Sequence, residues 1–134
     1  MTLFQVHICA CFFMTGLIWF VQVVHYPLFA QADKEIFIAF EAEHQKRTTF
    51  VVLPVMLVEL GSGVYLLMLS MTRDWGLLTA LLGMIWLSTF LLQVPCHKKL
   101  ESGYSRAVID RLVLTNWIRT LCWTARSALF LFAM

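Results

Sequence analysis

Hydrophobic residues gather in four long stretches along this chain, and polar residues interrupt them at helical intervals. The stretches run from Leu3 to Val24, from Thr48 to Ser70, from Leu77 to Val94 and from Leu112 to Phe132. A helix needs about 20 mostly apolar residues to cross the hydrocarbon core of a bilayer. The pattern therefore predicts an all-α protein, an integral membrane four-helix bundle that occupies residues 1–134 as a single domain.

The first stretch is expected to be a permanent span. No Lys or Arg precedes it, and no small-x-small cleavage site follows it before His25. A cleaved signal peptide has both features, so the stretch should remain in the mature protein.

One long hydrophilic segment, Gln31 to Arg47, separates the first two stretches. Apolar residues recur in it at helical spacing, at Ile36, Phe37 and Phe40. Charged residues interleave with them, at Lys34, Glu41, Glu43 and Lys46. The segment is predicted to be an amphipathic cytoplasmic extension of the second helix.

Prolines and a glycine mark the expected ends and bends of the helices. Pro27 is expected to end the first helix. Pro54 lies inside the second stretch, where it frees the carbonyl of Phe50 and should kink the helix. Gly103 followed by Ser105 predicts a turn and an N-cap before the fourth helix.

Composition agrees with a membrane protein. Hydrophobic residues make up 60% of the chain and charged residues 13%, and the mean hydropathy is +0.79. These values are typical of chains whose solvent is the bilayer. Four spans leave no room for a soluble catalytic module, so any chemistry is expected in or beside the membrane.

The basic residues predict an orientation. Cytoplasmic loops are enriched in Lys and Arg, and the loops after the first and third stretches carry Lys34, Lys46, Arg47, Lys98, Lys99, Arg106 and Arg111, against Arg73 on the other side. Both termini are therefore expected outside a bacterial-type inner membrane, with multi-pass topology. This asymmetry accounts for the formal net charge of +2, so no nucleic-acid binding is expected. The expected partner is the lipid bilayer, with other membrane subunits or a homo-oligomer left open.

The cysteines argue against thiol chemistry. The chain has four cysteines and no Cys-x-x-Cys motif. Cys9 and Cys11 point about 200° apart on a helix. A membrane oxidoreductase that passes electrons through thiols needs a paired, accessible dithiol.

Polar residues within the stretches form helical stripes, and such residues at membrane depth are costly unless they are paired or used. On the first stretch His7, Gln22 and His25 share one face. On the second, His44 and Glu59 belong to a stripe with Thr48, Val52, Val55 and Ser62. Eleven residues of helix, at about 1.5 Å each, place Glu59 near the middle of the membrane.

The fourth stretch supplies counter-ions. Asn116, Arg119, Trp123 and Arg126 follow one helical face. We expect Glu59 to pair with Arg126 or Arg119, because an unpaired charge at this depth would have to neutralise or distort the bilayer. Interhelical packing alone would need only two charges. The excess of positive charge therefore suggests an anionic group, such as a carboxylate or propionate, in the site.

Three histidines are predicted to meet at the inner surface, namely His25, His44 and His97. Neutral imidazole suits zinc, copper or iron, so this group is a candidate metal site. Gln93 lies one turn before His97. Contact with lipid phosphates is the alternative, because basic residues surround these histidines.

Residues spread along the chain resemble the membrane-embedded, heme-containing type of bacterial protoporphyrinogen IX oxidase. The shared features are His7 followed by Phe12, Phe13, Gly16 and Leu17, then Lys46, Arg47 and Pro54, then a third span from Trp75 to Lys98-Lys99-Leu100 before Gly103. The resemblance implies heme b with His7 as an axial ligand. The family also expects a Lys in the third span, whereas this chain has Leu77-Leu78-Thr79-Ala80 there.

Another part of the chain is similar to small four-helix membrane proteins of the anthrone-oxygenase-like group. The residues are Val94-Pro95-Cys96-His97 and Asn116-Trp117-Ile118-Arg119. Both resemblances imply redox chemistry on a planar hydrophobic molecule.

The sequence thus favours an inner-membrane redox-type protein that binds heme b, or another hydrophobic cofactor or substrate, within the bundle. The candidate catalytic residues are Glu59, Arg119 and Arg126, and the candidate cofactor-binding residues are His7, His25, Gln22, Asn116 and Trp123. In this scheme Glu59 handles a proton or balances charge. Two alternatives stay open: an accessory subunit of a larger membrane complex without chemistry of its own, and a transporter of a small acid.

Overall fold

The structure is a computed structural model that describes residues 1–132, and all regular elements in this range are helical. They are α1 (Leu3–Phe20), η1 (Val21–His25), α2 (Tyr26–Phe29), α3 (Phe37–Ser70), α4 (Arg73–Ser88), η2 (Thr89–Gln93), α5 (Val94–Leu100) and α6 (Arg106–Phe132). The prediction of an all-α fold is confirmed for the described residues.

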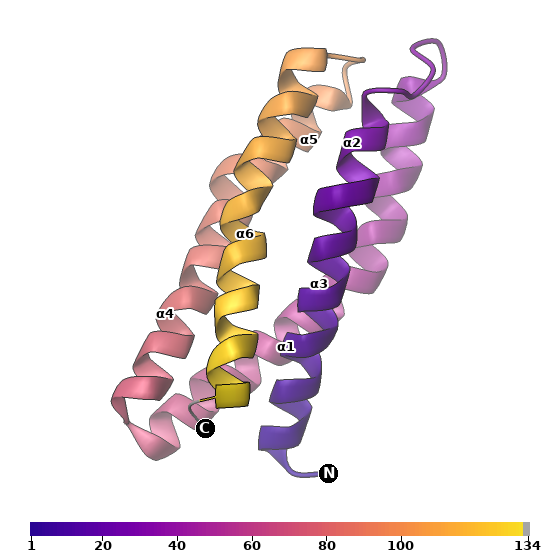
Figure 1. The fold of residues 1–134 in the computed structure, drawn as a ribbon. Helices are drawn as coiled ribbons and strands as arrows, with labels where there is room; N and C mark the ends of the chain where they lie inside the picture. Colours follow the sequence, from indigo (N-terminus) through magenta and orange to yellow (C-terminus); the bar gives the residue numbers. More distant parts are fainter. Residues whose placement is uncertain (133–134) are drawn as a thin grey trace.

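These elements join into four long helical segments that lie side by side (Figure 1). Elements α1, η1 and α2 form one continuous segment, Leu3–Phe29, and elements α4, η2 and α5 form another, Arg73–Leu100. The chain termini lie at one end of the molecule, and the connections before α3 and before α6 lie at the other (Figure 1). We call the second end the loop end.

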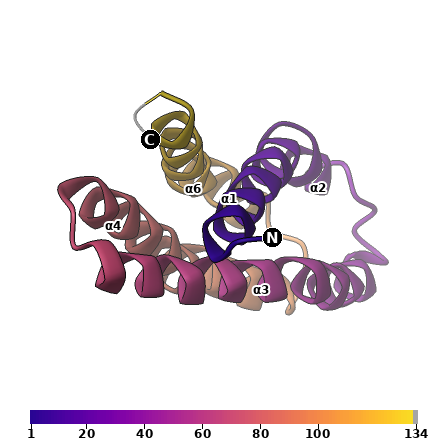
Figure 2. The ribbon, with the colours of Figure 1, turned by 90° about the horizontal axis from the view of Figure 1, so that it is seen from below.

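The helices contact one another in a ring. Helix α1 packs against α3 and α6, and α4 packs against the same two helices. Seen from the end that carries the termini, α1 lies between α6 and α3, and α4 lies on the side away from α2 (Figure 2). Farther along, α3 meets α5, but within the described residues no Cα atom of α3 comes within 8 Å of a Cα atom of η2, which lies between α4 and α5. This gap in the ring is where the cleft described below is found.

Three helical segments are long and apolar enough to cross a membrane: Leu3–Phe29, Phe37–Ser70 and Arg73–Leu100. Helix α6 is not among them, although it was predicted to be the fourth span. It has a comparable length but carries Asn116, Arg119 and Arg126, which lower its hydropathy. All three side chains are buried inside the protein. The outward-facing residues of this part of α6 are therefore more apolar than the average over the helix.

Proline does not end the first helix, contrary to expectation. The chain continues through Pro27 to Phe29, and Pro95 likewise lies inside a segment that continues to Leu100. In each case the turn before the proline is a π-helix, in which the backbone N–H of Tyr26 bonds the carbonyl of Val21 and that of Val94 bonds the carbonyl of Thr89. A π-turn widens the helix and accommodates the missing N–H and the ring of proline.

Helix α3 shows two of the predicted features. It begins at Phe37, so most of the amphipathic segment is a continuous extension of the second apolar stretch. Phe37 is fully buried and packs edge-on against Phe29 and Tyr104. Pro54 lies near the middle of the helix, and the ribbon changes direction there (Figure 1), as expected from the lost hydrogen bond.

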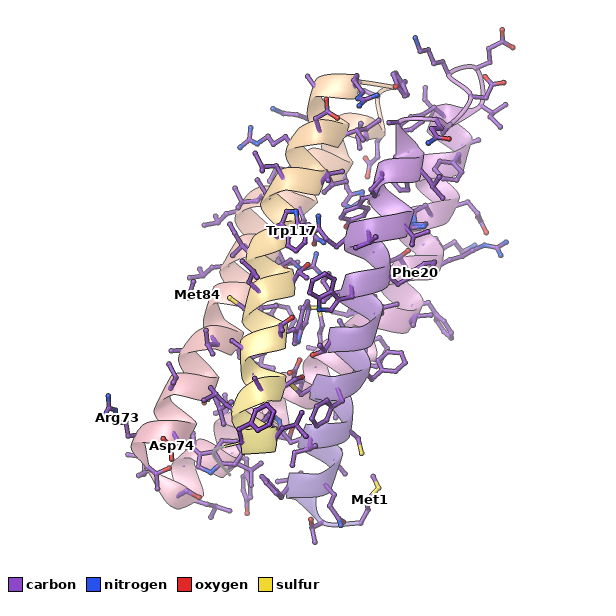
Figure 3. All side chains as sticks on the ribbon, viewed as in Figure 1. Met1, Phe20, Arg73, Asp74, Met84 and Trp117 are labelled. Carbon is purple, nitrogen blue, oxygen red and sulfur yellow. The ribbon has the colours of Figure 1, made fainter. Side chains whose placement is uncertain are left out.

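The outward side chains are apolar in the middle of the bundle, as on a lipid-facing surface, and polar at the end that carries the termini. Phe20, Met84 and Trp117 are exposed on three different helices, whereas Arg73 and Asp74 lie toward the end of the molecule that also carries Met1 (Figure 3). Within the described residues all four cysteines are free, with Cys9 exposed and Cys11 buried.

Candidate functional site

Glu59 and Arg126 form a buried ion pair between α3 and α6. Nη2 of Arg126 lies 3.2 Å from Oε1 of Glu59, and the two side chains are 1% and 0% exposed. The indole Nε1 of Trp123 donates a 2.9 Å hydrogen bond to Oε2 of Glu59. Of the two partners predicted for Glu59, the structure contains Arg126.

His7 completes this ion-pair cluster, which we define as His7, Glu59, Ser62, Trp123 and Arg126. Nη2 of Arg126 lies 3.1 Å from Nε2 of His7, and Nδ1 of His7 lies 2.8 Å from Oγ of Ser62. A guanidinium only donates, so Nε2 must accept and Nδ1 must carry the hydrogen of a neutral imidazole. Both ring nitrogens are therefore occupied.

A glycine gives His7 its place in the cluster. A Cβ atom at Gly63 would lie 2.9 Å from Cε1 of His7, closer than van der Waals contact allows. The imidazole thus packs directly on the backbone of α3. Sequence reasoning placed His7 at the outer end of its helix and missed its contact with Arg126, although the Ser62-Gly63 pair marks a point where two helices approach closely.

A second polar layer lies between η1 and α6. Asn116 donates to Oε1 of Gln22 at 2.9 Å, and Gln22 donates to the carbonyl of Val113 at 3.0 Å. Thr120 shares the same Gln22 oxygen. Gln22 and Asn116, both predicted to bind a cofactor, thus bond each other and connect the helices, and neither lines the cleft described next.

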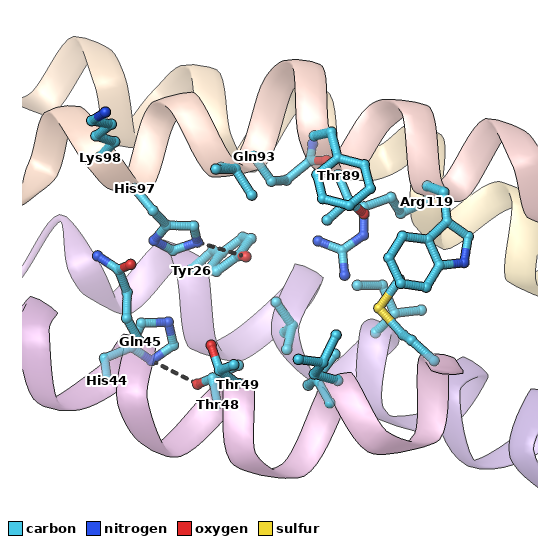
Figure 4. A pocket seen from close by; sticks show the side chains of 18 of the residues that line it. Tyr26, His44, Gln45, Thr48, Thr49, Thr89, Gln93, His97, Lys98 and Arg119 are labelled. Atoms are coloured by element: carbon cyan, nitrogen blue, oxygen red, sulfur yellow. Dashed lines mark hydrogen bonds between the residues drawn. The ribbon is translucent and has the colours of Figure 1, made fainter. Parts of the chain in front are cut away.

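A cleft of about 400 Å³ opens beside this layer, between α3 and the segment that contains η2 and α5. Apolar side chains form its deep wall and sides: Ile18, Val21, Val52, Leu53, Met56, Trp86, Phe90 and Val94. Polar side chains gather toward the loop end: Tyr26, His44, Gln45, Thr48, His97, Lys98 and Glu101 (Figure 4). The cleft is thus amphipathic along its length.

Arg119 is the buried cation of this cleft. Its side chain is 7% exposed, and its guanidinium points into the cavity (Figure 4). It lies 5.4 Å from the centre of the Trp123 ring. No carboxylate within residues 1–132 lies at ion-pair distance from it, and its Nε has no hydrogen-bond partner in that range.

A hydrogen-bonded chain runs from the cleft to the loop end. The hydroxyl of Tyr26 lies 3.1 Å from Nε2 of His97, and Nδ1 of His97 lies 2.6 Å from Oε1 of Glu41. Glu41 is 0% exposed. Sequence reasoning placed Glu41 with the charged positions of its segment, but Phe37, Glu41 and His44 share a helical face at i, i+4 and i+7. That spacing was the available signal for a buried carboxylate.

The three histidines predicted to meet do lie together. Nε2 of His25 is 2.9 Å from Nδ1 of His44, and the rings of His44 and His97 are 5.5 Å apart. Their nitrogens are directed at one another and at neighbouring hydroxyls and carboxylates. Among the residues that the structure describes, no group of three or more His, Cys, Asp or Glu side chains is arranged to hold a metal ion, so the predicted metal site is not supported.

The expected heme does not fit the histidines assigned to it. An axial ligand needs a free imidazole nitrogen that faces a slot for the macrocycle. His7 has both nitrogens occupied, is fully buried and lies outside the cleft. His25 lies outside the cleft as well, with Nε2 engaged by His44.

Comparison with family models, with curated proteins and with solved structures finds no match to this chain. The two resemblances described above therefore stay predictions, and the functional argument rests on the geometry of the cleft.

Proposed function

We propose that the protein is a multi-pass four-helix bundle of a bacterial-type inner membrane, with both termini outside. Termini at one end and two connections at the other agree with an even number of crossings (Figure 1). The connections and adjoining turns at the loop end carry most of the Lys and Arg residues, as cytoplasmic loops do. Arg119 and Arg126 of α6 are turned inward, and its exposed charges, Arg106, Asp110 and Arg111, lie in its first turns near the loop end, which makes this helix compatible with a fourth crossing.

We further propose that the cleft binds a hydrophobic small molecule that carries an anionic or acceptor-rich head group. The observation that carries this proposal is Arg119, a buried cation without an acidic partner that points into an apolar cavity. Burial of an uncompensated charge is expensive, and an anionic ligand would compensate it. Binding pockets commonly combine apolar walls with few convergent polar groups.

The cleft opens laterally, between two helices that flank it. Several of its lining residues are also part of the outer apolar surface, among them Leu53, Phe90 and Val94. A ligand dissolved in the bilayer would enter from the side, with its apolar part against these residues and its head toward Arg119. The redox function expected from the resemblances would need such a hydrophobic substrate or cofactor, and it remains a proposal beyond this binding step.

Blocking the cleft tests the proposal. Thr49 is exposed and lines the cleft, so Thr49→Trp should fill it, whereas the adjacent Phe50 is 82% exposed and lies outside it. The proteins would be purified from membranes in mild detergent, and bound compounds would be extracted and analysed by mass spectrometry. Wild type and Phe50→Trp should retain a hydrophobic acid or acceptor-rich compound that Thr49→Trp loses. Equal bound compounds in all three proteins, or none in wild type, would contradict the proposal.

A further inference from the structure

The hydrogen-bonded series Tyr26, His97 and Glu41 has a defined direction of donation. If Glu41 is ionised it only accepts, so Nδ1 of His97 donates to it and Nε2 of a neutral His97 accepts from the hydroxyl of Tyr26. The carboxylate orients the imidazole and stabilises it when it gains a second proton, as carboxylate–histidine pairs do in acid–base catalysis. The arrangement can therefore accept a proton at Tyr26 and hold it at His97.

The two ends of this series reach different surroundings. Tyr26 lines the cleft together with Arg119 (Figure 4). At the other end, Gln45 donates to Oε1 of Glu41 at 3.2 Å and to Oε1 of Glu101 at 3.1 Å. Glu101 is exposed at the loop end. The amide of Gln45 only donates in both bonds, so it orients Glu41 and relays no proton. The side chain of His97 is itself 14% exposed, so a proton held on His97 exchanges with water at the surface that we assign to the cytoplasm.

The other polar groups around the series are few. Arg119 shares the cleft with Tyr26, the ring of His44 lies tilted 5.5 Å from that of His97, and Nε2 of His25 lies 2.9 Å from Nδ1 of His44. Lys98 and Glu101 lie at the mouth of the cleft. Arg119 favours an anion at the head of the cleft, and Glu41 favours a proton on His97. Both effects therefore favour transfer of a proton from the ligand to His97.

From this geometry we propose that the ligand of the cleft is a hydrophobic weak acid with an ionisable oxygen, and that Tyr26, His97 and Glu41 exchange its proton with the loop end. The inference rests on the proposed binding function and adds the ligand class and the proton path.

The proton transfer is balanced within these groups. As the O–H bond of the ligand breaks, its proton passes to the oxygen of Tyr26, and the proton of Tyr26 passes to Nε2 of His97. The ligand becomes an anion beside the Arg119 guanidinium, and His97 becomes an imidazolium beside the Glu41 carboxylate. The reverse sequence returns the proton.

An alkylated nitrophenol is a suitable probe, because its phenolate is coloured and its phenol is not. The protein would be reconstituted in vesicles, and binding of 2-octyl-4-nitrophenol would be compared with binding of its methyl ether after subtraction of protein-free vesicles. Wild type should bind the phenolate at least about tenfold more tightly than the ether, as a charge-assisted contact implies. Arg119→Gln should remove this preference, because it weakens phenolate binding about tenfold more than ether binding.

The proton path is tested by a rapid pH change on one side of the vesicles. The colour of the bound probe should follow the pH at the loop end. Tyr26→Phe and Glu41→Gln should slow this response about tenfold or more, measured at probe concentrations that give equal occupancy in each protein. Tyr65→Phe, an exposed tyrosine on α3, and Glu43→Gln, an exposed carboxylate two residues from Glu41, are matched controls that should respond as wild type does.

The outcomes separate the two proposals. Binding of neither probe to wild type overturns both. Equal binding of phenol and ether, unaffected by Arg119→Gln, overturns the weak-acid inference and leaves cleft binding intact. A colour response that follows the opposite side, or one that Tyr26→Phe and Glu41→Gln leave unchanged, overturns the proton path.

Discussion

Arg119 and Arg126 lie two turns apart on the same face of α6, and both are buried, yet their surroundings differ completely. Arg126 meets the carboxylate of Glu59, which also accepts a hydrogen bond from Trp123, and the imidazole of His7. Arg119 faces an amphipathic cavity and meets no carboxylate within the described residues. Burial of a charge therefore does not by itself mark a functional site. A buried charge that lacks an acidic partner and faces a cavity is the more informative feature.

The opposing helices produce this difference. Near Arg126, the small residues Ser62 and Gly63 let the first helix approach α3 until His7 contacts the backbone. Near Arg119, no Cα atom of η2 comes within 8 Å of a Cα atom of α3 in the described residues, and the bend at Pro54 separates the two halves of α3. The same face of α6 is thus closely packed around Arg126 and borders a cleft around Arg119.

Removal of one member of the ion pair should have the largest effect. We expect Glu59→Gln and Arg126→Leu each to lower the free energy of unfolding by about 3–5 kcal/mol, because each leaves an uncompensated buried charge. The double variant should lose clearly less than the sum. Equilibrium unfolding in detergent would measure these changes. In a double-mutant cycle of Glu59 with Arg119 the two losses of unfolding free energy should be additive. If Glu59 were instead coupled to Arg119 and additive with Arg126, Arg119 would be the partner of Glu59.

A methyl group at the helix contact should have the next largest effect. Gly63→Ala forces Cβ against the imidazole of His7, and we expect a loss of about 1–3 kcal/mol, as is usual for overpacking. At Gly61 a Cβ would meet nothing within 4 Å. Gly61→Ala should therefore be neutral or slightly stabilising, since alanine is the better helix former. Similar unfolding free energies for the two variants would show that α1 and α3 are not closely packed at His7.

Replacement of Arg119 should contrast with replacement of Arg126. Arg119→Met removes a buried charge that has no acidic partner and keeps a long apolar side chain. We expect the free energy of unfolding without ligand to fall by no more than about 0.5 kcal/mol, or to rise. The measurement is the same as for Arg126→Leu. A loss as large as that of Arg126→Leu would remove the distinction between the two sites.

The smallest perturbation is a surface cysteine, which tests which arginine lies nearer the cytoplasm. With exposed Cys9 replaced by Ser, Ser102→Cys at the loop end should react with a membrane-impermeant reagent from the cytoplasmic side, and Asp74→Cys should react from the outside. This result would place Arg119 and the cleft head in the cytoplasmic half of the bilayer. Labelling of position 102 from the outside would reverse the orientation.

Helical periodicity in the sequence predicted most of the faces that are buried. The stripes through His7 and Gln22 and through Asn116, Arg119 and Arg126 are buried in the structure. Of the stripe on the second helix, Glu59 and Ser62 are buried, whereas His44, Thr48, Val52 and Val55 are half-buried. Helical periodicity is a local property, because 3.6 residues per turn place positions i, i+3, i+4 and i+7 on one face whatever lies opposite. Apolar length predicted four spans, and within residues 1–132 three helical segments are long and apolar enough to cross a membrane.

Only the tertiary structure decided which buried groups meet. The choice of Arg126 over Arg119 for Glu59, the contact of His7 with that pair, and the line from Tyr26 to Glu41 all depend on the axial position of one helix relative to another. The π-turns before Pro27 and Pro95 and the bend at Pro54 set those positions. They change the direction of a helix and the axial position of the residues that follow, by amounts that periodicity does not encode. If one helix shifts by one turn relative to its neighbour, about 5.4 Å, a side chain meets a different partner.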